Sequence, residues 1–388
     1  MRNRIARRLD RVSPSGIRKF FDLISSMEGV ISLGVGEPDF ATPWHITEAA
    51  IHSLGQGYTM YTSNSGMLEL RREIASYLKA AYNLDYDPNT ELLITNGVSE
   101  GVDLAVRAIL DPGDEVIMPD PCYVSYPSCV LFADGVPVHV ATNCDNEFKL
   151  RAADVEARIT DRTKAILIGY PANPTGAVME MADLADIADV ARRHNLLVIS
   201  DEIYNLLVYE IEPTCFACLP EIKERTILLG GFSKFYAMTG WRIGYAAASA
   251  DIIAAMTRIH QYTALCAPIM GQVAAIEALR AGEEEARRML EEYDRRRRVI
   301  VKGLNDIGLS CFEPRGAFYA FPSITATGLS SEEFAEKLLR QEKVAVVPGS
   351  AFGECGEGHV RCCYATSLSN IEEAVTRMAR FVKKHRRA

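Results

Sequence analysis

The run Leu197-Val198-Ile199-Ser200-Asp201-Glu202-Ile203-Tyr204 is the clearest indication of how this chain folds. It opens with consecutive branched apolar residues, which is typical of a strand buried on both faces of a parallel sheet. The carboxylate of Asp201 follows at once, and the phenol of Tyr204 comes three residues later. Ligands of open parallel sheets bind at the carboxyl ends of the strands, so we expect both side chains at such an edge.

The same pattern recurs between about residues 46 and 280, where short apolar runs alternate with longer stretches of helical period. Further strand-like runs are found at 91–95, 115–119, 165–169 and 226–229. This alternation predicts an α/β domain. After Gly282, three glutamates precede apolar residues at helical spacing, which predicts a long amphipathic helix leading into a second domain. We therefore expect a large domain over 46–280. An N-terminal arm and a smaller α+β domain would occupy 1–45 and 281–388.

Composition excludes several classes of protein. The 388 residues are 48% hydrophobic and 24% charged, as in ordinary globular chains, and the net charge of −9 argues against a nucleic-acid partner. No apolar run approaches the roughly 20 residues of a membrane helix, and the basic stretch 1–11 lacks the apolar region of a secretory signal. The Cys-x-x-Cys pair at 215–218 has no second pair at zinc-ligand spacing, so we expect no metal site. The ten cysteines are expected to be free thiols of a cytoplasmic protein without a membrane partner.

Lys234 lies in the run Gly230-Gly231-Phe232-Ser233-Lys234, eight residues before Arg242. A lysine forms Schiff bases with carbonyl compounds when burial and a neighbouring cation lower its pKa. Arg242 can bind a phosphate through paired hydrogen bonds, and Ser233 adds a hydroxyl. A lone lysine is usually a solvated surface residue. Its glycine-rich and apolar surroundings instead favour a carbonyl cofactor that carries a phosphate, which describes pyridoxal phosphate.

Four other strand ends carry residues with both a structural and a chemical interpretation. Ser99 begins a helix after 91–95, where it is either a plain N-cap or, with Val98, part of a phosphate site. Asn173 belongs to an Asn-Pro-Thr-Gly turn and is also able to bind a ring oxygen. Tyr123 fits either the core or a stacked aromatic ring. Asp201 is suited to capping a helix or to pairing with a pyridine nitrogen.

Taken together, these motifs resemble the class I aminotransferases, which are fold type I enzymes dependent on pyridoxal 5'-phosphate. The run 237–245, Ala-Met-Thr-Gly-Trp-Arg-Ile-Gly-Tyr, is similar to the archaeal and bacterial branch that holds aspartate and aromatic aminotransferases. The strings Ser-Asp-Glu-Ile-Tyr at 200–204 and Pro-x-Asn-Pro-Thr-Gly at 171–176 resemble two further signatures. The resemblance implies a mostly parallel seven-stranded sheet between helices in the large domain, with a smaller α+β domain beside it.

The resemblance also implies residue roles. Lys234 would carry the cofactor and shuttle the proton, while Asn173 and Arg361 would bind the substrate with a backbone contact from Gly36. Tyr61 would reach the phosphate of a neighbouring subunit, which implies a homodimer with shared active sites. The cofactor-binding residues would be Val98, Ser99, Tyr123, Asn173, Asp201, Tyr204, Ser233 and Arg242. Relatives often have a second serine at the position of Gly231.

The implied reaction is ping-pong transfer of an amino group from an L-amino acid to 2-oxoglutarate. Some aspartate-specific relatives have a lysine at the position of Ser99, and the run Arg18-Lys19-Phe20-Phe21-Asp22 resembles aromatic-type members, so an aromatic or broad donor range is expected, with aspartate still possible. A carbon-sulfur β-lyase of the same fold is the main alternative. A DNA-binding regulator is disfavoured by the acidic charge balance. An NAD-dependent dehydrogenase is disfavoured because 34–39 lacks the third glycine of a dinucleotide fingerprint.

Overall fold

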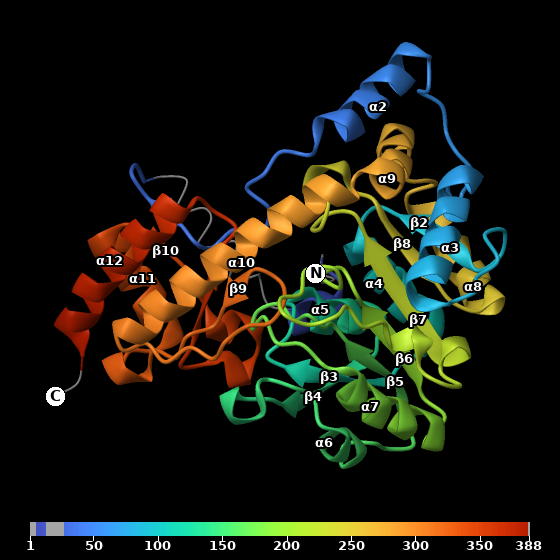
Figure 1. The fold of residues 1–388 in the computed structure, drawn as a ribbon. Coiled ribbons are helices and arrows are strands. Elements are labelled where there is room, and N and C mark those ends of the chain that lie inside the picture. The colour runs from blue at the N-terminus through green and yellow to red at the C-terminus, as the bar shows by residue number, and fades with distance from the viewer. Residues whose placement is uncertain (1–4, 13–26, 387–388) are drawn as a thin grey trace.

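The computed structural model describes residues 5–12 and 27–386. Its main sheet has seven strands in the order β2-β8-β7-β6-β5-β3-β4 (Figure 1). Both pairings of β8 are antiparallel, and the remaining pairings in this sheet are parallel. The expected α/β fold with a mostly parallel sheet is therefore confirmed. The strands are β2 (Leu92–Thr95), β3 (Glu115–Asp120), β4 (Val136–Ala141), β5 (Thr163–Ile168), β6 (Leu197–Asp201), β7 (Thr226–Gly231) and β8 (Gly244–Ala247).

Helices cover both faces of this sheet, which explains why its central strands are continuously apolar. On β6, Ile199 packs in the core cluster that includes α4 (Val98–Ile109) and α8 (Ala250–Thr263), whereas Val198 packs in the cluster that includes α7 (Met181–Arg193). Alternate residues of one strand thus face opposite helical layers. The other helices around the sheet are α2 (Trp44–Gly55), α3 (Leu68–Tyr82), α5 (Ser125–Phe132), α6 (Ala152–Glu156) and α9 (Ile269–Ala281).

The C-terminal part builds a second layered unit on α10 (Glu283–Asp306), the long helix that the sequence predicts. A three-stranded antiparallel sheet, β11-β12-β9, packs there with α11 (Ser331–Glu342) and α12 (Leu368–His385). β1 (Ile31–Ser32) pairs with β10 (Val344–Ala345), which joins the N-terminal arm to this unit. The remaining strands are β9 (Tyr319–Ala320), β11 (Val347–Pro348) and β12 (Val360–Cys363). The domain boundaries near residues 46 and 280 stay a prediction.

Short 3-10 helices connect these elements. They are η1 (Arg7–Arg11), η2 (Cys144–Asn146), η3 (Phe216–Cys218), η4 (Lys223–Arg225), η5 (Thr239–Trp241), η6 (Thr325–Thr327), η7 (Gly349–Phe352) and η8 (Glu354–Gly356). Within the described ranges, no helix is long and apolar enough to cross a membrane.

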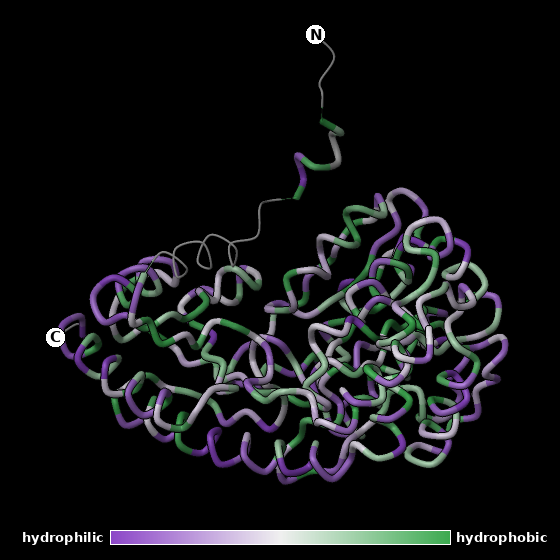
Figure 2. Tube along the Cα trace, turned by 90° about the horizontal axis from the view of Figure 1, so that it is seen from above, coloured by the Kyte–Doolittle hydropathy of each residue, from purple (hydrophilic) through white to green (hydrophobic). Residues whose placement is uncertain are grey.

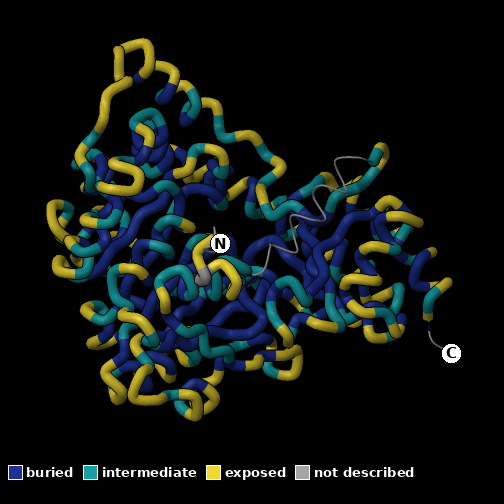
Figure 3. The backbone as a smooth tube through the Cα atoms, turned by 180° about the vertical axis from the view of Figure 1, so that it is seen from behind, coloured by how far each residue is buried: buried dark blue, intermediate teal, exposed yellow. Residues whose placement is uncertain are grey.

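The surface is mostly polar, and Figure 2 shows hydrophilic segments along much of the rim of the molecule. The connection from α2 to α3 departs from this pattern. Residues 54–61 are all exposed, and Figure 3 shows this connection largely in yellow at the upper left. It presents apolar side chains to solvent, among them Met60 at 62% and Tyr61 at 78% exposure.

Candidate active site

A cavity of about 280 Å³ lies at the carboxyl ends of β6 and β7, where the sheet topology places the predicted motifs. All but one of the predicted site residues line it. Those lining it are Gly36, Val98, Ser99, Tyr123, Asn173, Asp201, Tyr204, Ser233, Lys234, Arg242 and Arg361. Tyr61 is the exception, because it lies on the exposed connection after α2.

Lys234 stands three residues beyond β7, and its side chain lines the cavity. Nζ donates a 2.7 Å hydrogen bond to the carbonyl oxygen of Gly36. The ring of Tyr204 lies 5.7 Å from Nζ. Burial lowers the pKa of Lys234 to about 8, and the charge of Arg361 also lowers it. An amine with this pKa is partly neutral near physiological pH, as a nucleophile or general base must be.

Asp201 ends β6 with a buried carboxylate held by two donors. Tyr126 Oη donates to Oδ2 at 2.8 Å, and the Ile203 amide donates to Oδ1 at 3.1 Å. Burial raises the pKa of Asp201 to about 6, although these two hydrogen bonds and the charge of Lys234 oppose the rise. Asp201 is thus a carboxyl group able to exchange a proton near neutrality, fixed in one orientation.

Two phenols form the wall next to Lys234. The hydroxyls of Tyr204 and Tyr319 are 2.6 Å apart, and Tyr319 Oη also lies 3.5 Å from the Gly36 carbonyl oxygen, to which it donates. A Cβ at position 36 would come within 2.5 Å of Tyr319 Oη, so glycine is required for this approach. Burial raises the pKa of both phenols above the usual value, which keeps them neutral donors.

Arg361 extends from β12 and is 4% exposed. Nη1 donates to Asn173 Oδ1 at 2.9 Å, and Nη2 donates to the Gly34 carbonyl oxygen at 2.6 Å. Its guanidinium carbon lies 4.6 Å from the ring centre of Tyr319. The buried Nε has no hydrogen-bond partner. A rigid guanidinium with an unused donor is suited to a carboxylate ligand.

The N-terminus of α4 forms a cup at the other end of the cavity. Gly97 is the N-cap residue with φ 79°, and no side chain caps the helix. Ser99 therefore does not act as the cap, and α4 begins at Val98, one residue before the expected start. Arg242 Nη2 donates to Ser99 Oγ at 3.2 Å, and a Cβ at position 97 would lie 2.5 Å from that nitrogen. Free amides, a hydroxyl and a guanidinium thus converge here, a combination that binds phosphate.

Tyr123 lies in the cavity wall next to Tyr126. Their rings meet edge to face, with centroids 5.5 Å apart and planes at 84°. The segment 18–22, which resembles aromatic-type members, lies outside the described residues.

Comparison with known proteins identifies the family. A family model for class I and II aminotransferases matches residues 28–378. The chain belongs to this family. A Bacillus subtilis protein, YugH, is 55% identical over 97% of each chain, and the aspartate aminotransferase of Pyrococcus abyssi is 46% identical over 97% of each chain. A crystal structure of the aromatic aminotransferase from Pyrococcus horikoshii superposes with a TM-score of 0.90 at 44% identity, covering 94% of this chain and 99% of the other. The protein is therefore an aminotransferase that acts on amino and oxo acids.

Class I aminotransferases depend on pyridoxal 5'-phosphate, and the cavity of this aminotransferase fits that cofactor. The cup offers an uncapped helix N-terminus beside Arg242, as a phosphate requires. Lys234 presents an amine of lowered pKa, and Asp201 presents a buried carboxyl that a basic ring nitrogen would suit as a partner. The unpaired Nε of Arg361 remains for a substrate.

No sequence motif predicted a role for three residues near the site, Tyr126, Tyr319 and Glu202. Tyr126 follows Tyr123 by three residues and lies in the first turn of α5, so its closeness to a predicted strand end gave a usable signal. Tyr319 contacts Gly36 across 283 positions of the chain, and no local pattern marks it.

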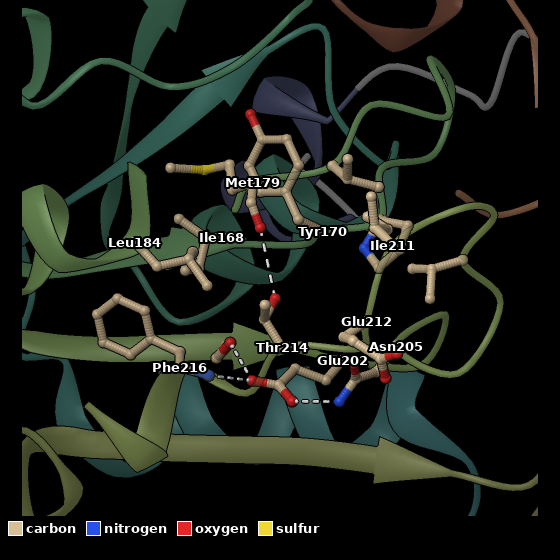
Figure 4. A pocket seen from close by; sticks show the side chains of 14 residues that line it. Ile168, Tyr170, Met179, Leu184, Glu202, Asn205, Ile211, Glu212, Thr214 and Phe216 are labelled. Carbon is tan, nitrogen blue, oxygen red and sulfur yellow. Dashed lines mark hydrogen bonds between the residues drawn. The ribbon is translucent and has the colours of Figure 1, made fainter. Parts of the chain in front are cut away.

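Glu202 lies next to Asp201 but faces a separate, small pocket (Figure 4). Its carboxylate accepts hydrogen bonds from Ser200 Oγ at 3.0 Å, the Phe216 amide at 2.8 Å and Asn205 Nδ2 at 2.9 Å. Burial raises the pKa of Glu202 to about 7. The bond to the Phe216 amide ties the turn that carries Tyr204 to the segment at η3.

Proposed function

We propose that this aminotransferase transfers the amino group of an aromatic or other neutral L-amino acid to 2-oxoglutarate, with aspartate as a weaker donor. The supporting observation is the set of cations in the cavity. Among the described residues that line it, Lys234, Arg242 and Arg361 are the only lysines or arginines. Arg242 is engaged at the cup, and Arg361 suits an α-carboxylate, so the described residues that line the cavity include no third cation that would select an acidic donor side chain over a neutral one.

The proposed chemistry assigns a task to each wall of the cavity. Bound pyridoxal phosphate supplies an electron sink for the negative charge left at Cα when its proton departs. Arg361 binds the α-carboxylate through paired hydrogen bonds and so orients the Cα–H bond. Lys234 would take the Cα proton onto the neutral Nζ and return it on the same side of the cavity. Asp201 would face the ring nitrogen and favour its protonated form, since a buried carboxylate favours a charged partner.

The remaining assignments concern cofactor binding. Tyr204 and Asn173 would donate to the ring oxygen, Tyr123 would stack on the ring, and Gly36 would contact the substrate through its backbone. The phosphate would be held by Val98, Ser99, Ser233 and Arg242. Ser233 is buried at the cavity wall, as a ligand of an enclosed phosphate would be.

We also propose a homodimer in which Tyr61 completes the partner's active site. This chain exposes apolar side chains around α2 and the end of α8, and a monomer rarely presents so many together. They are Trp44, Ile51, Leu54, Tyr58, Met60, Tyr61, Tyr262 and Leu265. The two segments are joined, since Asn64 Nδ2 donates to the Leu265 carbonyl oxygen at 2.8 Å.

A cytoplasmic location is proposed as well. All ten cysteines are free, and thiols persist in a reducing compartment. The division of the chain into a large domain over 46–280 and a smaller unit from 1–45 and 281–388 belongs to the same proposal. In its support, β1 pairs with β10 and α9 ends at Ala281.

A screen of all L-amino acids with 2-oxoglutarate tests the reaction, with glutamate as the measured product. We expect phenylalanine and tyrosine to give the highest kcat/KM, and Lys234→Ala to abolish turnover. Glutamate formation fastest with aspartate would overturn the donor assignment. Release of pyruvate from cystathionine, without glutamate from any donor, would instead support a β-lyase.

A further inference from the structure

A hydrogen-bonded pair, His260 and Glu100, lies behind the cup at the N-terminus of α4. His260 comes from α8 and is fully buried. Its Nδ1 donates to Glu100 Oε1 at 2.9 Å, and its buried Nε2 has no hydrogen-bond partner. Glu100 stands in the first turn of α4, directly after Ser99. The pair does not line the cavity, and the chemistry proposed above does not use it.

The second oxygen of Glu100 continues this chain of contacts toward the cup. Glu100 Oε2 accepts the Asn96 amide at 2.6 Å and Asn96 Nδ2 at 3.2 Å. The carbonyl oxygen of Asn96 in turn accepts a hydrogen bond from Arg242 Nη2 at 3.3 Å. Hydrogen bonds therefore run without interruption from His260 through Glu100 and Asn96 to the guanidinium of Arg242.

Glu100 is a negative charge close to a site for a negatively charged phosphate, and these contacts hold its carboxylate in place. Burial raises the pKa of Glu100, but the hydrogen bonds from His260 and Asn96 outweigh burial, so the pKa is lowered and the group is an anion. A helix N-terminus attracts any anion. A carboxylate in the first turn that was free to swing toward the cup would compete with a phosphate for the same amides and repel it. His260 and Asn96 occupy both oxygens and hold the carboxylate back.

We propose that His260 is a positioning residue for the cofactor phosphate. It holds the Glu100 carboxylate away from the cup. In that position the carboxylate accepts a hydrogen bond from the Asn96 amide, and the Asn96 carbonyl oxygen accepts one from Arg242. The inference rests on the proposed assignment of Ser99 and Arg242 to the phosphate. It adds that phosphate affinity depends on a histidine that does not touch the cofactor.

The test compares two ligands of the apo-protein, pyridoxal 5'-phosphate and pyridoxal, which lacks the phosphate. Dissociation constants are measured by absorbance titration. Loss of a hydrogen bond to a charged group predicts that His260→Leu weakens pyridoxal phosphate about tenfold or more and changes pyridoxal less than about twofold. His260→Asn, whose Nδ2 takes the place of Nδ1, should retain the affinity of the unmodified protein. His194→Leu is the matched control, because His194 pairs with Glu156 at 2.9 Å on the surface.

A second-site variant makes the test specific. If His260 acts by restraining Glu100, then adding Glu100→Gln to His260→Leu removes the misplaced charge and restores most of the phosphate affinity. Equal weakening of both ligands in His260→Leu, or no restoration by Glu100→Gln, overturns the proposal. Should His260→Leu not fold, His260→Gln serves instead, since it keeps a polar side chain but moves the donor away from Glu100.

Arg242→Gln in the same titration separates two ways of failing. Unchanged affinity for pyridoxal phosphate in Arg242→Gln overturns the phosphate assignment and the role of His260 with it. Loss of affinity in Arg242→Gln together with unchanged affinity in His260→Leu overturns the role of His260 alone.

Discussion

Tyr126 donates a 2.8 Å hydrogen bond to the buried carboxylate of Asp201, and this bond exists because position 169 is glycine. A Cβ there would lie 2.2 Å from Tyr126 Oη. The bond links α5 to the end of β6, so it fixes the direction of the carboxylate as well as its charge. An anion with only backbone support would be free to rotate.

Removing the hydroxyl of Tyr126 should destabilise the folded chain. Tyr126→Phe should lower the free energy of unfolding of the apo-protein by about 1.5–3 kcal/mol at pH 8, because a buried carboxylate loses one of two donors. Urea unfolding measures the effect. Tyr262→Phe is the control, since Tyr262 is 86% exposed and should leave unfolding unchanged. An unaltered midpoint for Tyr126→Phe would contradict the assigned bond.

The pH dependence of stability gives the second prediction. The pKa of Asp201 is about 6 in the folded chain, against an ordinary value of 3.8. A group with a raised pKa binds its proton more tightly when folded, so it costs stability progressively as the pH rises from about 4 through 6. Asp201→Asn should therefore make the apo-protein about 2–3 kcal/mol more stable than the unmodified chain above pH 7.

Below about pH 3 the two proteins should have equal stability, because Asp201 is then mostly protonated in both states. Urea unfolding at several pH values checks this. Asp154→Asn, at an exposed position, is the control. A stability gain of the same size at all pH values would show that desolvation of the charge is not its cause.

Chemical modification of Lys234 tests its lowered pKa. Acylation requires the neutral amine, so in the apo-protein its rate should rise with pH and reach half its maximum near pH 8. Mass spectrometry of the modified peptide measures this. Replacing Arg361 by methionine removes a positive charge that lowers this pKa, so the half-maximum should move to higher pH. A half-maximum above pH 10 in the unmodified protein would mean that the amine is solvated.

How far the sequence predicts this protein depends on whether a feature is local. Strands such as β6 were predictable because both faces are buried, and the residues that follow them converge at one sheet edge. β8 was not predicted, because Gly244–Ala247 has no branched residue, and β4 was missed because it is a half-exposed edge strand. Contacts such as Tyr319 with Gly36 join distant segments, and no local pattern specifies them.

Substrate binding by Arg361 supplies the next prediction. Arg361→Lys cannot reproduce the planar group that bonds Asn173 and Gly34 and still leaves Nε free. We expect KM for the amino acid to rise about 10- to 100-fold, with a smaller change in kcat, because a bidentate bond to the carboxylate is lost. Steady-state kinetics measure the split. Arg340→Lys, at an exposed pair with Glu336, should leave both constants unchanged. A fall in kcat at constant KM would assign Arg361 to the chemical step instead.

A mixing experiment tests whether two copies share each active site. Tyr61 is 78% exposed and lies outside the cavity that contains Lys234, so within one chain it has no evident task. If Tyr61 serves the partner's phosphate, Lys234→Ala and Tyr61→Ala dimers should each be weakly active or inactive. Refolding the two variants together should produce mixed dimers with one intact site, because both defects then fall on the other site. About a quarter of the unmodified activity is expected from a random mixture, in which half of the molecules are mixed dimers. Activity no higher than the average of the two parents would show that Tyr61 acts within its own chain or not at all.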